Sequence, residues 1–133
     1  MQSISKADIL DMLLFVEERI ALTIERCSGI VSVNDFLYSP DKVDIFDATC
    51  MRLQTIGEAV KNIDNLTHHD LLAGYSDVPW KSIIGLRNII SHEYLSIDPA
   101  EIFRIVTIHL PQLHSVILKI KDDVDAGSVQ DFL

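Results

Sequence analysis

Apolar residues recur along most of this chain at spacings of three and four, which is the period of an α-helix. Between residues 5 and 28 they form a single apolar stripe, and Gly29 directly after it is a natural stop. This pattern predicts a first amphipathic helix over 5–28. Its stripe is formed by Ile9, Leu13, Val16, Ile20, Ile24 and Cys27.

A second helix is predicted to start at Ser39 and Pro40, because serine caps a first turn and proline fits its first position. We expect it to run to about Ile63. Thr67, with an acidic residue three positions on, predicts the cap of a short helix that ends at Gly74. The apolar stripe of the second helix is Phe46, Cys50, Leu53, Gly57 and Val60.

Proline also marks the remaining helices. Pro79 predicts the start of a helix that continues into the 80s, and Asp98 with Pro99 is typical of the start of another. We expect this last helix to end near Asp122. Pro111 falls inside its pattern, where the missing backbone N–H should kink the helix.

Together these elements predict an all-α fold, a bundle of four long helices plus one short helix. The 133 residues suit one domain, which we place at 1–122. We expect residues 123–133 to form an acidic, mobile tail. The five glycines and four prolines leave room for few turns, which favours long helices over a sheet.

The charge balance limits the choice of partners. Twenty acidic and eleven basic side chains give a net charge of −9, which argues against broad binding to a phosphate backbone. Any RNA contact must then use a local positive site or a basic partner. Cys27 and Cys50 lie in apolar patterns, as expected for reduced core residues of a cytoplasmic protein. The chain shows neither a signal-peptide pattern nor an apolar run of about 20 residues, so we expect no membrane contact.

Residues 86–95, "LRNIISHEYL", combine this helical pattern with polar side chains. On a wheel of about 100° per residue, with Arg87 at zero, Tyr94 lies at about −20°, Ser91 at about 40°, Asn88 at about 100° and His92 at about 140°. The aliphatic residues occupy the opposite arc. An acidic protein would be expected to place acidic residues on a solvated face, yet this arc carries none between the arginine and the histidine.

These residue types suit RNA cleavage without a metal ion. Arg87 offers a permanent cation that can bind a phosphate, and His92 can exchange a proton near neutral pH. Asn88 is able to fix an imidazole tautomer or to hold a substrate oxygen. A base, an acid and a cation are what attack by a 2′-hydroxyl requires. One histidine per chain serves poorly as both base and acid, so we expect a homodimer that places two motif helices face to face.

The same residues carry a family resemblance. "RNIISHEY" matches the R-x-x-x-x-H motif and resembles the HEPN superfamily. The extended form R-x-x-x-x-H-x-Y is similar to HepT toxins, whose partner is a minimal nucleotidyltransferase called MntA. "RLQTIGEAVKNI" and "VPWKSIIGLRNIISHEY" look like this family too, so the resemblance covers about residues 46–94.

The resemblance implies an all-α homodimer with its active site in the intersubunit cleft. It also implies a metal-independent endoribonuclease without a cofactor, the toxin of a type VII-like toxin–antitoxin pair whose antitoxin is an MntA-like nucleotidyltransferase. Arg87 and His92 would be catalytic, with Asn88 and Ser91 supporting them. Tyr94 would be the residue that the partner modifies with adenylyl groups, which block the RNA cleft.

Glu58 has two interpretations. It lies between Gly57 and Ala59, small residues that allow close approach of helices. A carboxylate there would be placed to brace Arg87 or His92, and the alternative is an ordinary exposed glutamate.

Other candidates suit structural roles better. Adjacent His68 and His69 point apart, and the spacing of His109 and His114 suits chelation poorly, so we expect no metal site. We interpret Trp80 as a core or interface anchor rather than a base-stacking platform. The alternative function for the whole chain is a non-catalytic HEPN-type module that binds a nucleotide or a partner protein, which its acidic balance would suit.

Overall fold

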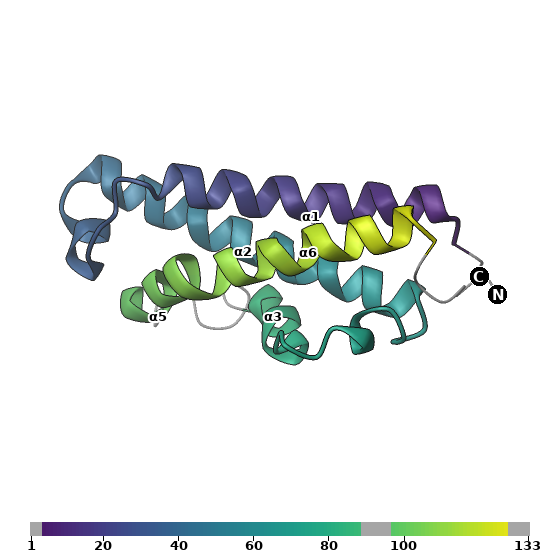
Figure 1. Ribbon diagram of the computed structural model, residues 1–133. Coiled ribbons are helices and arrows are strands. Elements are labelled where there is room, and N and C mark those ends of the chain that lie inside the picture. Colours follow the sequence, from purple (N-terminus) through teal and green to yellow (C-terminus); the bar gives the residue numbers. More distant parts are fainter. Residues whose placement is uncertain (1–3, 89–96, 128–133) are drawn as a thin grey trace.

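The computed structural model describes residues 4–88 and 97–127, and every regular element in these ranges is helical (Figure 1). The all-α fold class is therefore confirmed. None of the helices in these ranges is both long enough and apolar enough to cross a membrane. The α-helices are α1 (Lys6–Arg26), α2 (Pro40–Leu66), α3 (Trp80–Gly85), α5 (Pro99–Arg104) and α6 (Leu110–Asp125). The other helical elements in these ranges are short turns. They are the 3-10 turns η1 (Val33–Leu37), η2 (Leu72–Gly74) and η3 (Leu86–Asn88), and the π-helical turn η5 (Ile105–His109).

Helix α1 begins at the predicted cap and buries the predicted stripe. The Ser5 hydroxyl accepts a hydrogen bond from the backbone N–H of Asp8 at 3.0 Å, and the Asp8 carboxylate accepts one from the Ser5 N–H at 3.4 Å. This reciprocal pair satisfies two backbone donors at the helix start. The buried face packs against α2 and α6, which lie along α1 in Figure 1. Its residues include Ile9, Leu13, Val16 and Ile20, none of which is exposed.

Helix α2 begins as predicted but ends differently. Ser39 caps it and Pro40 is its first residue. Thr67, expected to cap a new helix, instead ends α2 with its hydroxyl donating to the carbonyl of Ile63 at 2.8 Å. His68 and His69 follow with φ of 57° and 62°, a left-handed conformation that turns the chain away from the helix. The prediction of a short α-helix after Thr67 was therefore wrong, and only the 3-10 turn η2 follows.

The C-terminal helical run accommodates its proline through a wider turn. Asp98 caps α5 by accepting a hydrogen bond from the N–H of Ala100 at 2.9 Å, as its sequence predicts. The π-helical turn η5 then separates α5 from α6, directly before Pro111 in the first turn of α6. A π turn widens the helix at the point where the proline ring would collide with the preceding turn. The irregularity expected at Pro111 takes this form.

Helix α6 continues past its predicted end at Asp122. The Tyr75 hydroxyl donates to the Asp123 carboxylate at 2.6 Å, and the Lys6 ammonium donates to the carbonyl of Asp125 at 2.7 Å. Val124 between them is buried. The first residues of the predicted tail thus belong to the helix, and residues 128–133 lie outside the described part of the chain.

An aromatic cluster joins the other end of the bundle. Phe36 of η1 is fully buried and meets the Phe46 ring of α2 edge-on, with 5.1 Å between ring centroids. It meets Phe103 of α5 in the same way at 6.4 Å. Edge-to-face pairs at these distances add to the free energy gained by burying the rings. One residue of a short turn therefore fixes α2 and α5 together.

Both cysteines are buried and unbridged, as the sequence predicts. The Cys27 sulfur lies 3.2 Å from the hydroxyl of Thr49, which ties α1 to α2. Burial raises the pKa of the Cys27 thiol. Burial, with the nearby charge of Asp47, raises the pKa of Cys50 to about 11. Both groups therefore stay protonated at neutral pH, which fits core residues rather than nucleophiles.

Candidate active site

The position of Arg87 is set by a close contact between two backbones. A Cβ atom built on Gly57 of α2 would lie 2.6 Å from the backbone nitrogen of Arg87 and 2.9 Å from the carbonyl oxygen of Ile83. Real Cβ atoms do not approach neighbours so closely, so the contact requires glycine. The close approach predicted at Gly57 is confirmed. Ala59 lies elsewhere, in a groove between α1 and α2.

Helix α3 is short and firmly anchored. The indole N–H of Trp80 donates to the carbonyl of Tyr75 at 2.8 Å, and the half-buried ring packs against the core. Trp80 is therefore a core anchor, as interpreted from the sequence. Pro79 caps α3 instead of being its first residue. The α-helix ends at Gly85 and a 3-10 turn carries Arg87, so the uniform α-helical wheel does not hold at the start of the motif.

Two of the predicted site residues meet across this contact. The Arg87 guanidinium lies 3.5 Å from the Glu58 carboxylate, measured from Nη1 to Oε2. The side chains are 34% and 54% exposed. An ion pair so open to water contributes at most about 1 kcal/mol to stability. Its consequence is geometric, because the carboxylate draws one edge of the guanidinium toward α2.

The remaining site residues are only partly described. Asn88 follows Arg87 in η3 and is exposed. Ser91, His92 and Tyr94 lie outside the described residues, so their placement beside Arg87 stays a prediction. Within 4–88 and 97–127 no cluster of three histidine, cysteine or acidic side chains could hold a metal ion.

One buried polar atom near this site has no hydrogen-bond partner. The side-chain oxygen of Gln54 is buried and has no hydrogen-bond partner among residues 4–88 and 97–127, and Gln54 lies one turn before Glu58 on the same side of α2. An unsatisfied buried carbonyl costs about 1–3 kcal/mol. Sequence reasoning passed over this residue, although a glutamine next to Leu53 in an apolar stripe was a visible signal.

Comparison with known proteins identifies the chain's relatives. A family model described as "Ribonuclease HepT-like" matches residues 16–120. A protein of Thermococcus cleftensis named "Probable ribonuclease HepT" is 31% identical over 111 residues, covering 84% of this chain and 94% of the relative. A protein of Caldanaerobacter subterraneus subsp. tengcongensis, named "Putative RNase TTE0752", is 34% identical over 97 residues, 73% of this chain and 80% of the relative.

Some relatives are longer than the matched region. In Methanocaldococcus jannaschii a protein named "Gamma-glutamylcyclotransferase and putative RNase MJ0434" is 32% identical over 79 residues, 59% of this chain but only 34% of that protein. No solved structure matches the chain with significance. The family match covers most of the chain and includes Glu58, Arg87 and the whole motif. The chain belongs to the ribonuclease HepT-like family.

Proposed function

We propose that this protein is a metal-independent endoribonuclease and the toxin of a toxin–antitoxin pair. The observation that carries the proposal is the position of Arg87. The Gly57 contact fixes its backbone against α2, and Glu58 holds one edge of its guanidinium. A part-exposed arginine suits phosphate binding, because its planar fork matches phosphate oxygens. In this acidic chain, Arg87 is the residue that we propose as the local positive site for RNA.

The proposed reaction transfers a phosphoryl group within the RNA. His92 takes the proton of a 2′-hydroxyl, whose oxygen attacks the adjacent phosphorus while the bond to the 5′-oxygen breaks. An acid protonates the departing 5′-oxygen, which gives a 2′,3′-cyclic phosphate and a 5′-hydroxyl end. Arg87 binds the phosphoryl oxygens as negative charge grows on them. Asn88 and Ser91 support this site by hydrogen bonding.

A homodimer completes this chemistry. Base and acid are needed in one step, and a second copy supplies a second His92 and a second Arg87 to a shared cleft. Closed two-fold dimers are the commonest assembly of soluble proteins, so the arrangement requires no unusual geometry.

Regulation is proposed to act on Tyr94. A partner nucleotidyltransferase would join the tyrosine oxygen to the α-phosphorus of ATP and release pyrophosphate. The adenylyl phosphate would bind Arg87 in place of the RNA backbone, and the adenine would occupy the cleft. Intact-mass measurement after co-expression with such an enzyme should find adenylate on the peptide that contains Tyr94. A Tyr94→Phe variant that is neutralised as well as the parent protein would contradict this mode of regulation.

Cleavage of RNA by the purified protein in EDTA tests the activity. Arg87→Ala and His92→Ala should each lower the cleavage rate by at least about a hundredfold with helicity unchanged. Arg104→Ala is the matched control, because Arg104 also forms an exposed ion pair, 3.0 Å from Glu101, on α5. Equal rates for Arg87→Ala and Arg104→Ala would remove the basis of the proposal.

The alternative, a non-catalytic module that binds a nucleotide or a protein, is favoured by the net charge of −9. It predicts nucleotide binding by the purified protein with no RNA cleavage at any protein concentration. In that case His92→Ala would leave binding unchanged, whereas Arg87→Ala would weaken it.

A further inference from the structure

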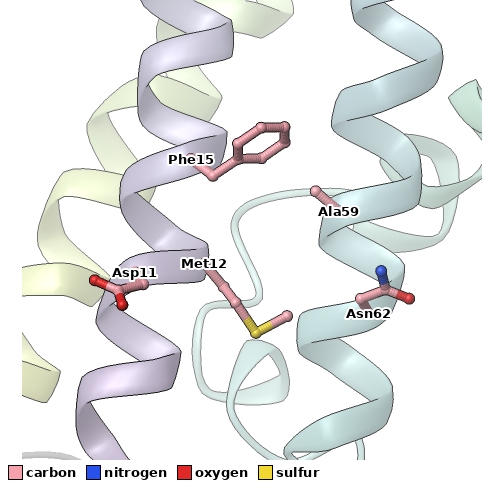
Figure 2. Close-up of a pocket in the computed structure, with 5 residues that line it drawn as sticks. All are labelled: Asp11, Met12, Phe15, Ala59 and Asn62. Atoms are coloured by element: carbon pink, nitrogen blue, oxygen red, sulfur yellow. The ribbon is translucent and has the colours of Figure 1, made fainter.

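An open groove of about 300 Å³ lies between α1 and α2. Met12 and Phe15 point from α1 toward Ala59 of α2, and Asn62 continues the α2 side (Figure 2). The fifth lining residue, Asp11, turns its carboxylate to the far side of α1, away from the groove. Phe15 is 40% exposed, so the groove offers an aromatic ring to a ligand.

Three of the chain's five arginines lie along the same junction of the two helices. The Arg19 guanidinium carbon lies 5.2 Å from the centroid of the Phe15 ring. Arg26 is seven positions further along α1 and therefore on the same side of that helix. Burial raises the pKa of the neighbouring Cys27 thiol, and the positive charge of Arg52 on α2 opposes this rise, so Arg52 lies close to the same end of α1. These three residues form an arginine strip that continues the groove.

The arginine strip is not neutralised by acidic side chains. None of its members forms an ion pair within residues 4–88 and 97–127, whereas Arg87 and Arg104 each pair with a glutamate. The Nη1 atom of Arg52 is buried and has no hydrogen-bond partner there. Glu18 and Glu25 each precede an arginine of the strip, but consecutive residues of a helix point about 100° apart and do not face each other. The strip is therefore open to an anion from another molecule.

An aromatic ring beside a row of cations suits a single strand of nucleic acid. An unpaired base stacks on an aromatic side chain, and arginines along a groove bind the phosphates of its backbone. Arg19 and Arg26 are about 10 Å apart along α1, so they reach two different groups of an extended ligand. We propose that an unpaired nucleotide of RNA binds here, with its base stacked on Phe15 and its flanking phosphates on Arg19 and Arg26.

Asp11 gives this site a direction. Its carboxylate lies at the end of the groove away from Arg26, where its negative charge repels phosphates. The backbone of the strand therefore leaves the groove toward Arg26.

The groove and the candidate active site flank the same helix. Ala59 of the groove directly follows Glu58, the partner of Arg87, and the two residues point about 100° apart around α2. A strand that crosses α2 can therefore contact both Phe15 and Arg87. The choice of RNA rests on the proposed function, whereas the exposed ring and the unpaired arginines do not. Because Phe15 binds a base away from the bond that is cut, it should affect KM and not kcat.

Two other ligands share part of this chemistry. A free nucleotide carries its phosphates at one point, whereas the arginine strip extends over about 10 Å of α1. An acidic segment of a partner protein supplies anions for the strip, but its carboxylates do not stack on Phe15. An RNA strand matches both the ring and the strip.

Binding of 2′-O-methyl oligonucleotides, measured by fluorescence anisotropy on the full chain, tests the site without cleavage. An adenylate strand is compared with an abasic strand, which carries the same phosphates and no bases. The parent protein should bind the adenylate strand about tenfold more tightly, and Phe15→Leu should bind both strands alike. Leu14→Ala is the matched control and should keep the preference, because Leu14 is also 40% exposed but does not line the groove.

The dependence of binding on salt tests the arginine strip. In Arg19→Gln and in Arg26→Gln, the slope of log K against the logarithm of salt concentration should fall in size by about 0.7. Arg104→Gln, on α5, should keep the parent slope.

Equal binding of both strands by the parent protein, or an unchanged preference in Phe15→Leu, overturns the inference even if the protein cleaves RNA. So does displacement of the adenylate strand by AMP alone, or by a polyglutamate peptide, as efficient as displacement by the unlabelled strand. In cleavage of unmodified RNA, Phe15→Leu should raise KM about tenfold with kcat unchanged. A protein that prefers the adenylate strand through Phe15 but leaves RNA intact supports the inference and counts against the proposed function alone.

Discussion

Replacing Gly57 with alanine should separate Arg87 from the rest of the candidate site. The added Cβ would meet three backbone atoms: the nitrogen of Arg87 at 2.6 Å and the carbonyl oxygens of Ile83 and Ile84 at 2.9 and 3.1 Å. Backbone atoms cannot rotate away as a flexible side chain can. The clash must therefore be relieved by moving α3 and η3 away from α2.

The size of this movement follows from the contact distances. Restoring the contact with Arg87 from 2.6 Å to the 3.4 Å of ordinary van der Waals contact needs a shift of about 0.8 Å. Alanine gains about 1 kcal/mol over glycine inside a helix, whereas overpacking a well-packed site costs about 1–3 kcal/mol. We expect a net loss of about 1 kcal/mol of stability. A misplacement of about 1 Å can lower a catalytic rate by about a hundredfold, so activity should fall far more than stability.

The assay compares Gly57→Ala with Gly85→Ala. A Cβ on Gly85 of α3 meets nothing within 4 Å, so this control carries the helix-propensity gain without the clash. Thermal unfolding should show Gly85→Ala at or above the parent midpoint and Gly57→Ala below it. RNA cleavage should persist in Gly85→Ala and drop by about a hundredfold in Gly57→Ala. Parent-like stability and cleavage in Gly57→Ala would refute the claim that this contact positions Arg87.

Three further changes test the bundle. In a urea unfolding experiment, Phe36→Ala should lower the free energy of unfolding by about 3–5 kcal/mol, because Phe36 is fully buried. Leu37→Ala should change it little, because the neighbouring Leu37 is 60% exposed. Gln54→Met should raise the thermal midpoint, because it removes a buried oxygen that has no partner. The hydrogen bond from Tyr75 is the main cause that lowers the pKa of Asp123 below its ordinary value of 3.8. This bond therefore stabilises the folded protein fully above pH 3.8, and the stabilisation is lost as the pH falls through the lowered pKa of Asp123. Tyr75→Phe should therefore be less stable than the parent at pH 7, with the difference shrinking below about pH 4.

Local signals predicted the starts of the helices well. Ser5, Ser39 and Asp98 each cap a helix through a side-chain hydrogen bond, and that bond depends only on residues within three positions. Thr67 shows where this reasoning fails. A threonine hydroxyl can bond either to a following N–H at a helix start or to a preceding carbonyl at a helix end, and the pattern around it does not decide between them.

The candidate site was predictable where it depends on residue size and charge. A glycine next to Glu58 predicts a close helix approach, and the structure places Arg87 at that approach. The 3-10 turn at Arg87 was not predicted, because the apolar spacing around it is that of an α-helix and carries no signal for a tighter turn.

The most direct test of the central claim is cleavage of an RNA oligonucleotide that carries a single 2′-deoxy nucleotide at the cut site, in EDTA. Without the 2′-hydroxyl the proposed attack has no nucleophile. The parent protein should cut the all-RNA oligonucleotide to a 2′,3′-cyclic phosphate and leave the substituted bond intact, and Arg87→Ala should cut neither. Cleavage at the 2′-deoxy position, or activity that appears only with added metal, would contradict the account.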